Sequence, residues 1–127
     1  MTEWKWISAE LAHVVHERQL AEHGGPEGIR DLGVIESALA RPEQLAHYGE
    51  PDVFDLAAAY CWGIARNHGY VDGNKRTGWL LARIFLADHG VRVRVDPIST
   101  VRAVEAVAAG TMTQDALAAW LRSCAVA

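Results

Sequence analysis

The chain has little of what marks secreted or membrane proteins. Its 127 residues include only two cysteines, Cys61 and Cys124, which lie far apart and form no CxxC pair. No apolar signal segment is found near the N-terminus, and charged residues interrupt every apolar run before it reaches the ~20 residues of a membrane span. These absences predict a cytoplasmic protein with buried, unpaired thiols and no membrane contact.

Positive charge is also scarce. Lysine and arginine total 12 against 16 aspartate and glutamate residues, which gives a net charge of −4 and a pI of about 5.8. No stretch is rich in lysine and arginine, so we expect no direct binding of nucleic acid. Internal repeats and low-complexity linkers are absent as well. Because a chain of this length can enclose one hydrophobic core but not two, we expect a single domain over 1–127.

Hydrophobic residues make up half of the chain, and their spacing predicts an all-α fold, a compact bundle of about six helices with a minor β element. We expect an extended arm or strand at 3–7, helices at 9–23, 32–40, 53–67, 74–89, 97–109 and 114–123, and a strand at 91–95 that pairs with the arm. Ser8, Asp52 and Thr113 are predicted helix caps. Pro42 is expected to end the second helix, and 43–51 to form a flexible flap.

Two pairs of polar residues lie outside the main motif. His13 and His16 are three residues apart on one predicted helix, a spacing that can ligate a metal. No carboxylate or thiol pattern nearby completes such a site, so surface or packed histidines are the favoured interpretation. Arg30 and Asp31 are interpreted as a local salt bridge.

The most informative stretch is 67–76, which joins two strongly apolar helical segments at 53–65 and 79–86. Both segments are apolar on most of their circumference, as is typical of helices inside a bundle. The short connection between them contains a histidine, an acid, an amide, a lysine and an arginine. Folding alone would accept almost any polar loop here, so this concentration of reactive side chains indicates a functional site.

Local physics favours a phosphate site in this connection. Asp72, Gly73 and Asn74 predict a turn followed by a helix start, where the first backbone N–H groups have no intrahelical partner and attract anions. Lys75 and Arg76 fall in the first helical turn, where the helix dipole disfavours cations by a few tenths of a kcal/mol. A phosphate between them would remove that conflict. The predicted phosphate-binding residues are therefore Gly73, Asn74, Lys75 and Arg76.

The same connection offers a metal ligand and a base. Asp72 can hold Mg²⁺, which binds through one or two carboxylates together with phosphate oxygens. His68 ends the preceding helix across the turn and is placed as a general base. Each residue has a plainer explanation, since a histidine at a helix end is often a cap and Asp-Gly is often only a turn. Their occurrence together favours the functional interpretation.

Residues 68–77, His-Gly-Tyr-Val-Asp-Gly-Asn-Lys-Arg-Thr, resemble the signature of the Fic/Doc superfamily. That signature reads His, Pro, Phe, any residue, Asp or Glu, Gly or Ala, Asn, Gly or Lys, and Arg. A second block at 24–42, which begins Gly-Gly and ends Ala-Arg-Pro, is similar to the upstream block of the Doc branch, the death-on-curing toxins. The resemblance covers most of the chain and implies a Fic/Doc-type bundle.

Four positions distinguish this chain within the superfamily. Gly69 and Tyr70 replace the usual Pro and Phe. Lys75 stands where AMP-transferring Fic proteins carry Gly, and Trp79 stands where they carry a second Arg. The last two departures favour the Doc branch, in which the γ-phosphate of ATP is transferred.

By resemblance the chain is the toxin of a toxin-antitoxin system and a protein kinase with ATP and Mg²⁺ as its cofactors. Its implied target is a threonine of elongation factor Tu, whose modification arrests translation. The implied inhibitor is a cognate antitoxin with a helical C-terminal segment that binds in a groove near the site. Arg66 resembles a family basic residue near the phosphates, although a cation at a helix C-terminus also suits the dipole without any ligand. The alternatives are a Fic-type AMP transferase and an inactive binding module, which Gly69 would favour.

Overall fold

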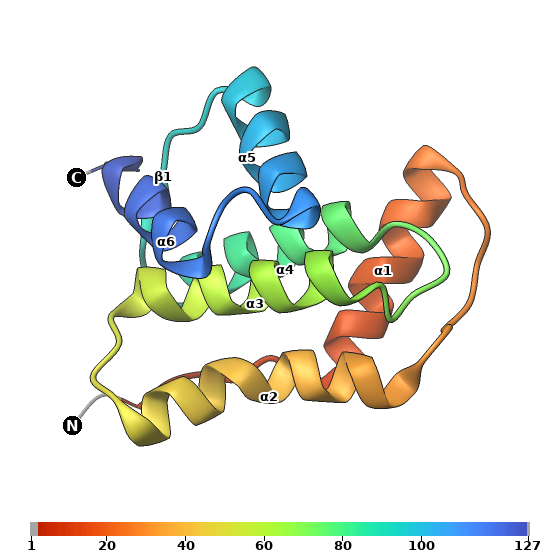
Figure 1. Cartoon of the computed structure of the whole chain (residues 1–127), viewed down its shortest axis with the longest axis horizontal. Helices are drawn as coiled ribbons and strands as arrows, with labels where there is room; N and C mark the ends of the chain where they lie inside the picture. The colour runs from red at the N-terminus through yellow and green to blue at the C-terminus, as the bar shows by residue number, and fades with distance from the viewer. Residues whose placement is uncertain (1–2, 127) are drawn as a thin grey trace.

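A computed structural model describes residues 3–126, which form six α-helices and two short strands (Figure 1). The elements, in chain order, are α1 (Ala9–His23), α2 (Leu32–Tyr48), α3 (Val53–Asn67), α4 (Asn74–Asp88), β1 (Arg92–Val93), α5 (Pro97–Ala109), α6 (Gln114–Ser123) and β2 (Ala125–Val126). The predicted all-α bundle with a minor β element is confirmed. None of the helices in the described residues is both long and apolar enough to cross a membrane.

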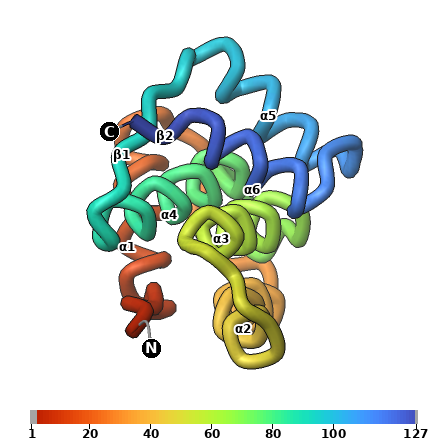
Figure 2. The backbone as a smooth tube through the Cα atoms, turned by 90° about the vertical axis from the view of Figure 1, so that its left-hand side faces the viewer, coloured from red at the N-terminus to blue at the C-terminus, as the bar shows by residue number. Residues whose placement is uncertain are grey.

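Helix α3 is the centre of the core. Figure 2 shows it nearly end-on, with α4 beside it, α2 below and α6 above, and its most extensive packing is against α4. The two helices approach closely because small residues face each other: a Cβ added to Gly78 of α4 would lie 2.9 Å from the carbonyl oxygen of Cys61 in α3. Burial raises the pKa of the Cys61 thiol to about 12, and both cysteines are unpaired. The turn between α3 and α4 lies at the end of the bundle beside α1 (Figure 1).

Polar side chains begin five of the six helices. Ser8, Asp31, Asp52, Asp96 and Thr113 each accept a hydrogen bond from the backbone N–H three residues later. The three predicted caps are confirmed. Asp31 caps α2 rather than pairing with Arg30, so the predicted local salt bridge was wrong. A carboxylate at this position gains a hydrogen bond and a favourable dipole interaction that a neighbouring arginine does not offer.

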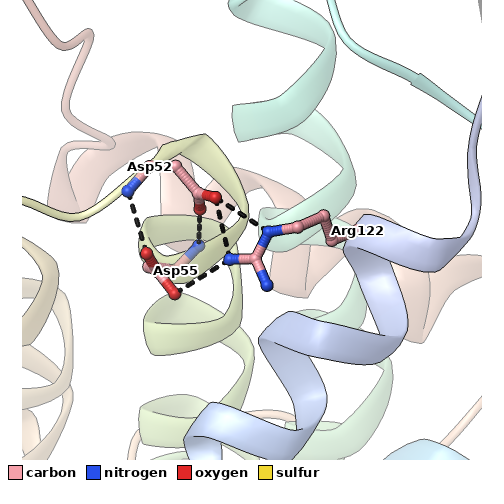
Figure 3. A network of polar contacts seen from close by, with 3 residues as sticks. All are labelled: Asp52, Asp55 and Arg122. Atoms are coloured by element: carbon pink, nitrogen blue, oxygen red, sulfur yellow. Dashed lines mark hydrogen bonds and ion pairs between the residues drawn. The ribbon is translucent and has the colours of Figure 1, made fainter.

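The start of α3 is further tied to α6 (Figure 3). Asp52 and Asp55 form a capping box, and Arg122 of α6 reaches both carboxylates, with its Nη2 2.8 Å from Asp52 and 3.2 Å from Asp55. Partial burial raises the pKa of Asp52. Hydrogen bonds from the Asp55 N–H and from Arg122, together with the arginine's charge, outweigh that effect and hold the pKa below the ordinary value of 3.8.

The structure corrects the second predicted helix. α2 continues through Pro42 to Tyr48, so the predicted stop at Pro42 and the predicted flap at 43–51 were both wrong. Proline disfavours a helix interior because it lacks an N–H and its ring crowds the preceding turn. Here Pro42 is fully buried, and Leu45 and Ala46 beyond it pack against the core. Burial of this face outweighs the local cost.

The predicted strand near 91–95 is present but has a different partner. β1 pairs in antiparallel fashion with β2 at the C-terminal end, with Arg92 opposite Val126 and Val93 opposite Ala125. The predicted pairing with the N-terminal arm was therefore wrong. The arm is extended, and its Trp4 and Trp6 rings pack 6.1 and 6.2 Å from the ring of Phe85. Packing against Phe85 buries part of their apolar surface and fixes the arm beside α4.

Candidate functional site

A cavity of about 480 Å³ opens at the turn between α3 and α4. It is lined by residues of the turn and of the start of α4, by Gly24 after α1, and by one face of α5. Six of the seven predicted site residues line it together: His68, Asp72, Gly73, Asn74, Lys75 and Arg76. Trp79, which replaces the second arginine of AMP-transferring proteins, also lines the cavity and packs 5.8 Å from the ring of Trp120.

Arg66 is the one predicted site residue that the structure does not bring to this cavity. It lines a separate cleft with Arg41 and Trp62, where its guanidinium lies 5.2 Å from the centre of the indole ring. Its Nη1 donates to the carbonyl of Val107, 3.4 Å away. The arginine at the end of α3 therefore packs against α5 and suits the helix dipole, which was the alternative to phosphate binding.

His68 ends α3 in the left-handed conformation, with φ 50° and ψ 45°. It is the one non-glycine residue with positive φ among residues 3–126. Such a backbone costs of order 1–3 kcal/mol and persists only where surrounding contacts impose it. The imposed geometry turns the chain sharply and leaves the imidazole exposed at the mouth of the cavity. An exposed histidine in an enforced position is suited to proton transfer.

The contacts that impose this turn come from the start of α2. The carbonyl of Gly69 accepts hydrogen bonds from the N–H groups of Arg30 and Asp31, at 2.8 and 2.9 Å. Gly69 itself is buried so tightly that an added Cβ would overlap Ile35 and lie 3.2 Å from the Ile35 backbone nitrogen. Glycine stands in place of the usual proline because α2 occupies the space that a ring would need. The close packing fixes the backbone beside His68.

Helix α1 holds the next part of the turn. The Tyr70 ring is stacked on His16 with centroids 3.7 Å apart, and its hydroxyl lies 2.8 Å from Nδ1 of His13. Burial, with a smaller effect of Glu17, raises the pKa of Tyr70 to about 12. His16 also hydrogen bonds to the carbonyl of Asp72 at 2.8 Å. The two histidines are thus packed residues, as favoured from the sequence, and residues 3–126 contain no cluster of three or more metal-ligating side chains.

Asn74 closes the turn internally. Its Oδ1 accepts from the N–H of Tyr70 and its Nδ2 donates to the carbonyl of the same residue, both at 3.0 Å. The side chain is only 7% exposed. Because both polar atoms are used by the loop, Asn74 has its backbone N–H, rather than its side chain, to offer a ligand.

The start of α4 is the electropositive part of the cavity. Gly73 occupies the N-cap position with φ 79° and provides no side-chain cap, and the first turn contains no acidic residue. Lys75 and Arg76 are exposed there, and neither pairs with a carboxylate of the described chain. Free N–H groups and two cations at a positive helix end can bind phosphate oxygens. The exposed carboxylate of Asp72 beside them fits Mg²⁺ shared with a phosphate.

Sequence reasoning missed the positioning role of α1. His16 and Gln19 are both buried, on the same face of the helix as Ala12, Val15 and Leu20. The signal was present in the sequence, because two polar residues interrupt an otherwise apolar stripe at helical spacing.

The family comparison agrees with this geometry. Residues 6–86 match the family model described as the Fic/DOC family. The chain is 46% identical over 76 residues to the protein named Toxin Doc of Mycolicibacterium smegmatis, an alignment that covers 58% of each chain. It is 35% identical over 92 residues to the protein named Protein kinase doc of Escherichia phage P1, covering 72% of this chain and 73% of the relative. The alignment to the first relative covers less than two thirds of that protein's length. The family match and the two relatives together show that the chain belongs to the Fic/DOC family, within its Doc branch.

Proposed function

We propose that this protein is a toxin of the Doc type, a protein kinase that transfers the γ-phosphate of ATP to a threonine hydroxyl of elongation factor Tu and so arrests translation. The observation that carries the proposal is the meeting of His68, Asp72 and two unpaired cations in one cavity at an uncapped helix start. The names of the two Doc relatives support the toxin and kinase parts. The target follows from the family resemblance. Because elongation factor Tu works in the cytoplasm, the proposal assigns the chain to that compartment.

Each predicted site residue that lines the cavity has a role in this reaction. The backbone N–H groups after Gly73, with Lys75 and Arg76, bind the phosphates and offset their charge. Asp72 would hold Mg²⁺, which would supply positive charge to offset that of the phosphate oxygens. His68 accepts the proton of the threonine hydroxyl as its oxygen bonds to the γ-phosphorus and the bond to the β-phosphate oxygen breaks, releasing ADP. Phosphoryl transfer depends mainly on positioning and charge stabilisation, so these few groups suffice.

The proposal includes a cognate antitoxin as a partner. One wall of the cavity is the face of α5 that carries Thr100, Val101 and Val104, and Val101 is 56% exposed. An amphipathic helical segment of the antitoxin that packs against this apolar wall would also close access to His68. Coexpression with the genomic neighbour should then suppress toxicity, and the copurified complex should melt at a higher temperature than the free chain. A neighbour that neither binds nor protects contradicts this part.

The decisive experiment incubates the purified chain with Mg²⁺ and elongation factor Tu, in parallel with ATP labelled at the γ- or the α-phosphate. We expect label from the γ position, lost in His68→Ala and in Asp72→Ala. His47→Ala, which removes an exposed histidine outside the cavity, is the matched control and should retain activity. Each variant should melt as a folded protein, so that lost activity reports on chemistry.

The other outcomes separate the alternatives. Label from the α position would overturn the kinase assignment in favour of an AMP transferase that works with Lys75 and Trp79. Label from neither position, in this assay and in a whole-lysate version, would favour an inactive binding module. In that case His68→Ala would be as toxic in cells as the parental chain.

A further inference from the structure

Gln19 of α1 is a buried carboxamide without a hydrogen-bond partner. The residue is 2% exposed, and neither its Nε2 nor its Oε1 finds a partner within the described chain. Both atoms are also shielded from solvent. A carboxamide offers two donors and an accepting oxygen, and native proteins leave few such groups unpaired in their interiors. An unpaired buried amide therefore needs an explanation.

The position of Gln19 supplies one. Its carboxamide lies directly against Gly73 at the start of α4, where an added Cβ would overlap Nε2 and lie 3.0 Å from Cδ. The same turn of α1 provides His16, which hydrogen bonds to the carbonyl of Asp72. On the other side of the turn, a Cβ added to Gly25 would lie 2.5 Å from Oδ2 of Asp72. Helix α1 thus presents two polar side chains to one turn, and only His16 is paired.

The turn that Gln19 touches belongs to the electropositive end of α4. Gly73 provides no cap for the helix, and Lys75 and Arg76 follow in its first turn. An anion at this end would attract the first N–H groups of α4 and repel the Asp72 carboxylate, so the peptide groups of the turn would shift. Glycine at position 73, in the left-handed conformation with φ 79°, gives the backbone the freedom to adjust. The unpaired carboxamide of Gln19 beside this turn can then form a hydrogen bond to it when an anion binds.

We propose that Gln19 is a positioning residue of the anion site, whose carboxamide hydrogen bonds to the Asp72–Gly73 turn when a phosphate binds at the start of α4. The inference rests on the part of the proposed function that brings phosphate to this helix, not on phosphoryl transfer or on its target. Gln19 raises affinity because the bond that it lacks in the free protein is gained on binding. One hydrogen bond gained on binding typically raises ligand affinity by about 3- to 10-fold.

The test replaces Gln19 by methionine, which has nearly the same shape and no donor. Calorimetric titration measures the affinity of the parental chain and of Gln19→Met for Mg²⁺-ATP and for inorganic phosphate, and thermal unfolding measures both proteins without ligand. Gln44→Met on the exposed face of α2 is the matched control. We expect Gln19→Met to melt at the parental temperature or above it and to bind each ligand about 3- to 10-fold more weakly. Gln44→Met should be unchanged in both measurements.

The changes in ligand affinity and in melting temperature together separate a positioning role from a purely structural one. Equal affinity in Gln19→Met and the parental chain would overturn the inference while leaving the kinase proposal intact. A melting temperature of Gln19→Met well below the parental value would overturn it as well, because Gln19 would then support the fold. Weaker phosphate binding in Gln19→Met together with no group transfer by the parental chain would sustain the inference and reject the kinase. A parental chain that binds neither ligand rejects both.

Discussion

Replacing Gly69 by alanine tests whether α2 fixes the backbone beside His68. The added Cβ would overlap Cγ1 of Ile35, which is 1% exposed and has no free space to retreat into. It would also approach the backbone nitrogen of Ile35 to 3.2 Å and the carbonyl oxygen of Asp31 to 3.3 Å. Overpacking of this kind costs about 1–3 kcal/mol. Alanine returns about 0.4–1 kcal/mol by restricting the unfolded chain, since the φ of Gly69 lies outside the left-handed region.

The midpoints of these ranges give a net loss of about 1.3 kcal/mol for Gly69→Ala, which lowers Tm by roughly 4–8 °C in a domain of this size. Gly33→Ala is the matched control. Gly33 is exposed on α2, and an added Cβ there would make only an ordinary 3.4 Å contact with Oδ1 of Asp31. That control should gain about 0.5–1 kcal/mol from helix propensity. Differential scanning calorimetry measures the Tm of both variants and of the parental chain. An unchanged or raised Tm in Gly69→Ala would refute the argument that α2 excludes a side chain here.

Three further changes test the site and its frame. Asn74→Ala leaves the N–H and carbonyl of Tyr70 without partners in a buried turn, so we expect a loss of about 2–4 kcal/mol by urea unfolding, and a loss below 0.5 kcal/mol would contradict the loop-closing role. Arg76→Ala removes an exposed cation, so calorimetric titration should show weaker Mg²⁺-ATP binding at an unchanged Tm, and unchanged affinity would exclude Arg76 from the phosphate site. Arg122→Gln should cost a few tenths to about 1 kcal/mol at pH 7. Because the folded pKa of Asp52 lies below 3.8, this stabilisation is present above that value and is lost as pH falls through the folded pKa. The difference from the parental chain in urea titrations should therefore shrink below about pH 4, and a pH-independent difference would indicate lost packing instead.

The features predicted correctly from the sequence depend on neighbours within a few residues. Ser8, Asp52 and Thr113 cap their helices because a short side chain can reach the backbone N–H three residues on, whatever the rest of the fold does. The turn at Gly73 is likewise local, since only glycine adopts its positive φ without cost. The turn signal was enough to place Asp72, Lys75 and Arg76 together at the start of one helix.

Apart from the Arg30–Asp31 salt bridge, which a local helix cap replaces, the wrong predictions concern choices that distant residues make. Pro42 ends a helix in isolation, but its burial in the core keeps α2 intact to Tyr48. The local sequence of β1 does not decide whether it pairs with the N-terminal arm or with β2. In the structure β1 pairs with β2, and the tryptophans of the arm pack on Phe85. Arg66 was interpreted either as a phosphate-binding residue or as a cation that suits the helix dipole, and the structure directs its side chain into the cleft beside Trp62 rather than into the cavity of His68. Residues that are close in sequence at a helix end can therefore direct their side chains to different parts of the surface.

Buried and exposed side chains of the site have different roles. Tyr70 and Asn74 of the motif are buried, and their polar groups bond to α1 or to the loop itself. His68, Asp72, Lys75 and Arg76 are exposed. A motif that served only to join two helices would need the buried set alone, because that set already fixes the turn. The exposed set adds like charges at a positive helix end and a histidine in a strained backbone, both of which cost stability. The phosphate proposed for this site would offset the cost of the two cations.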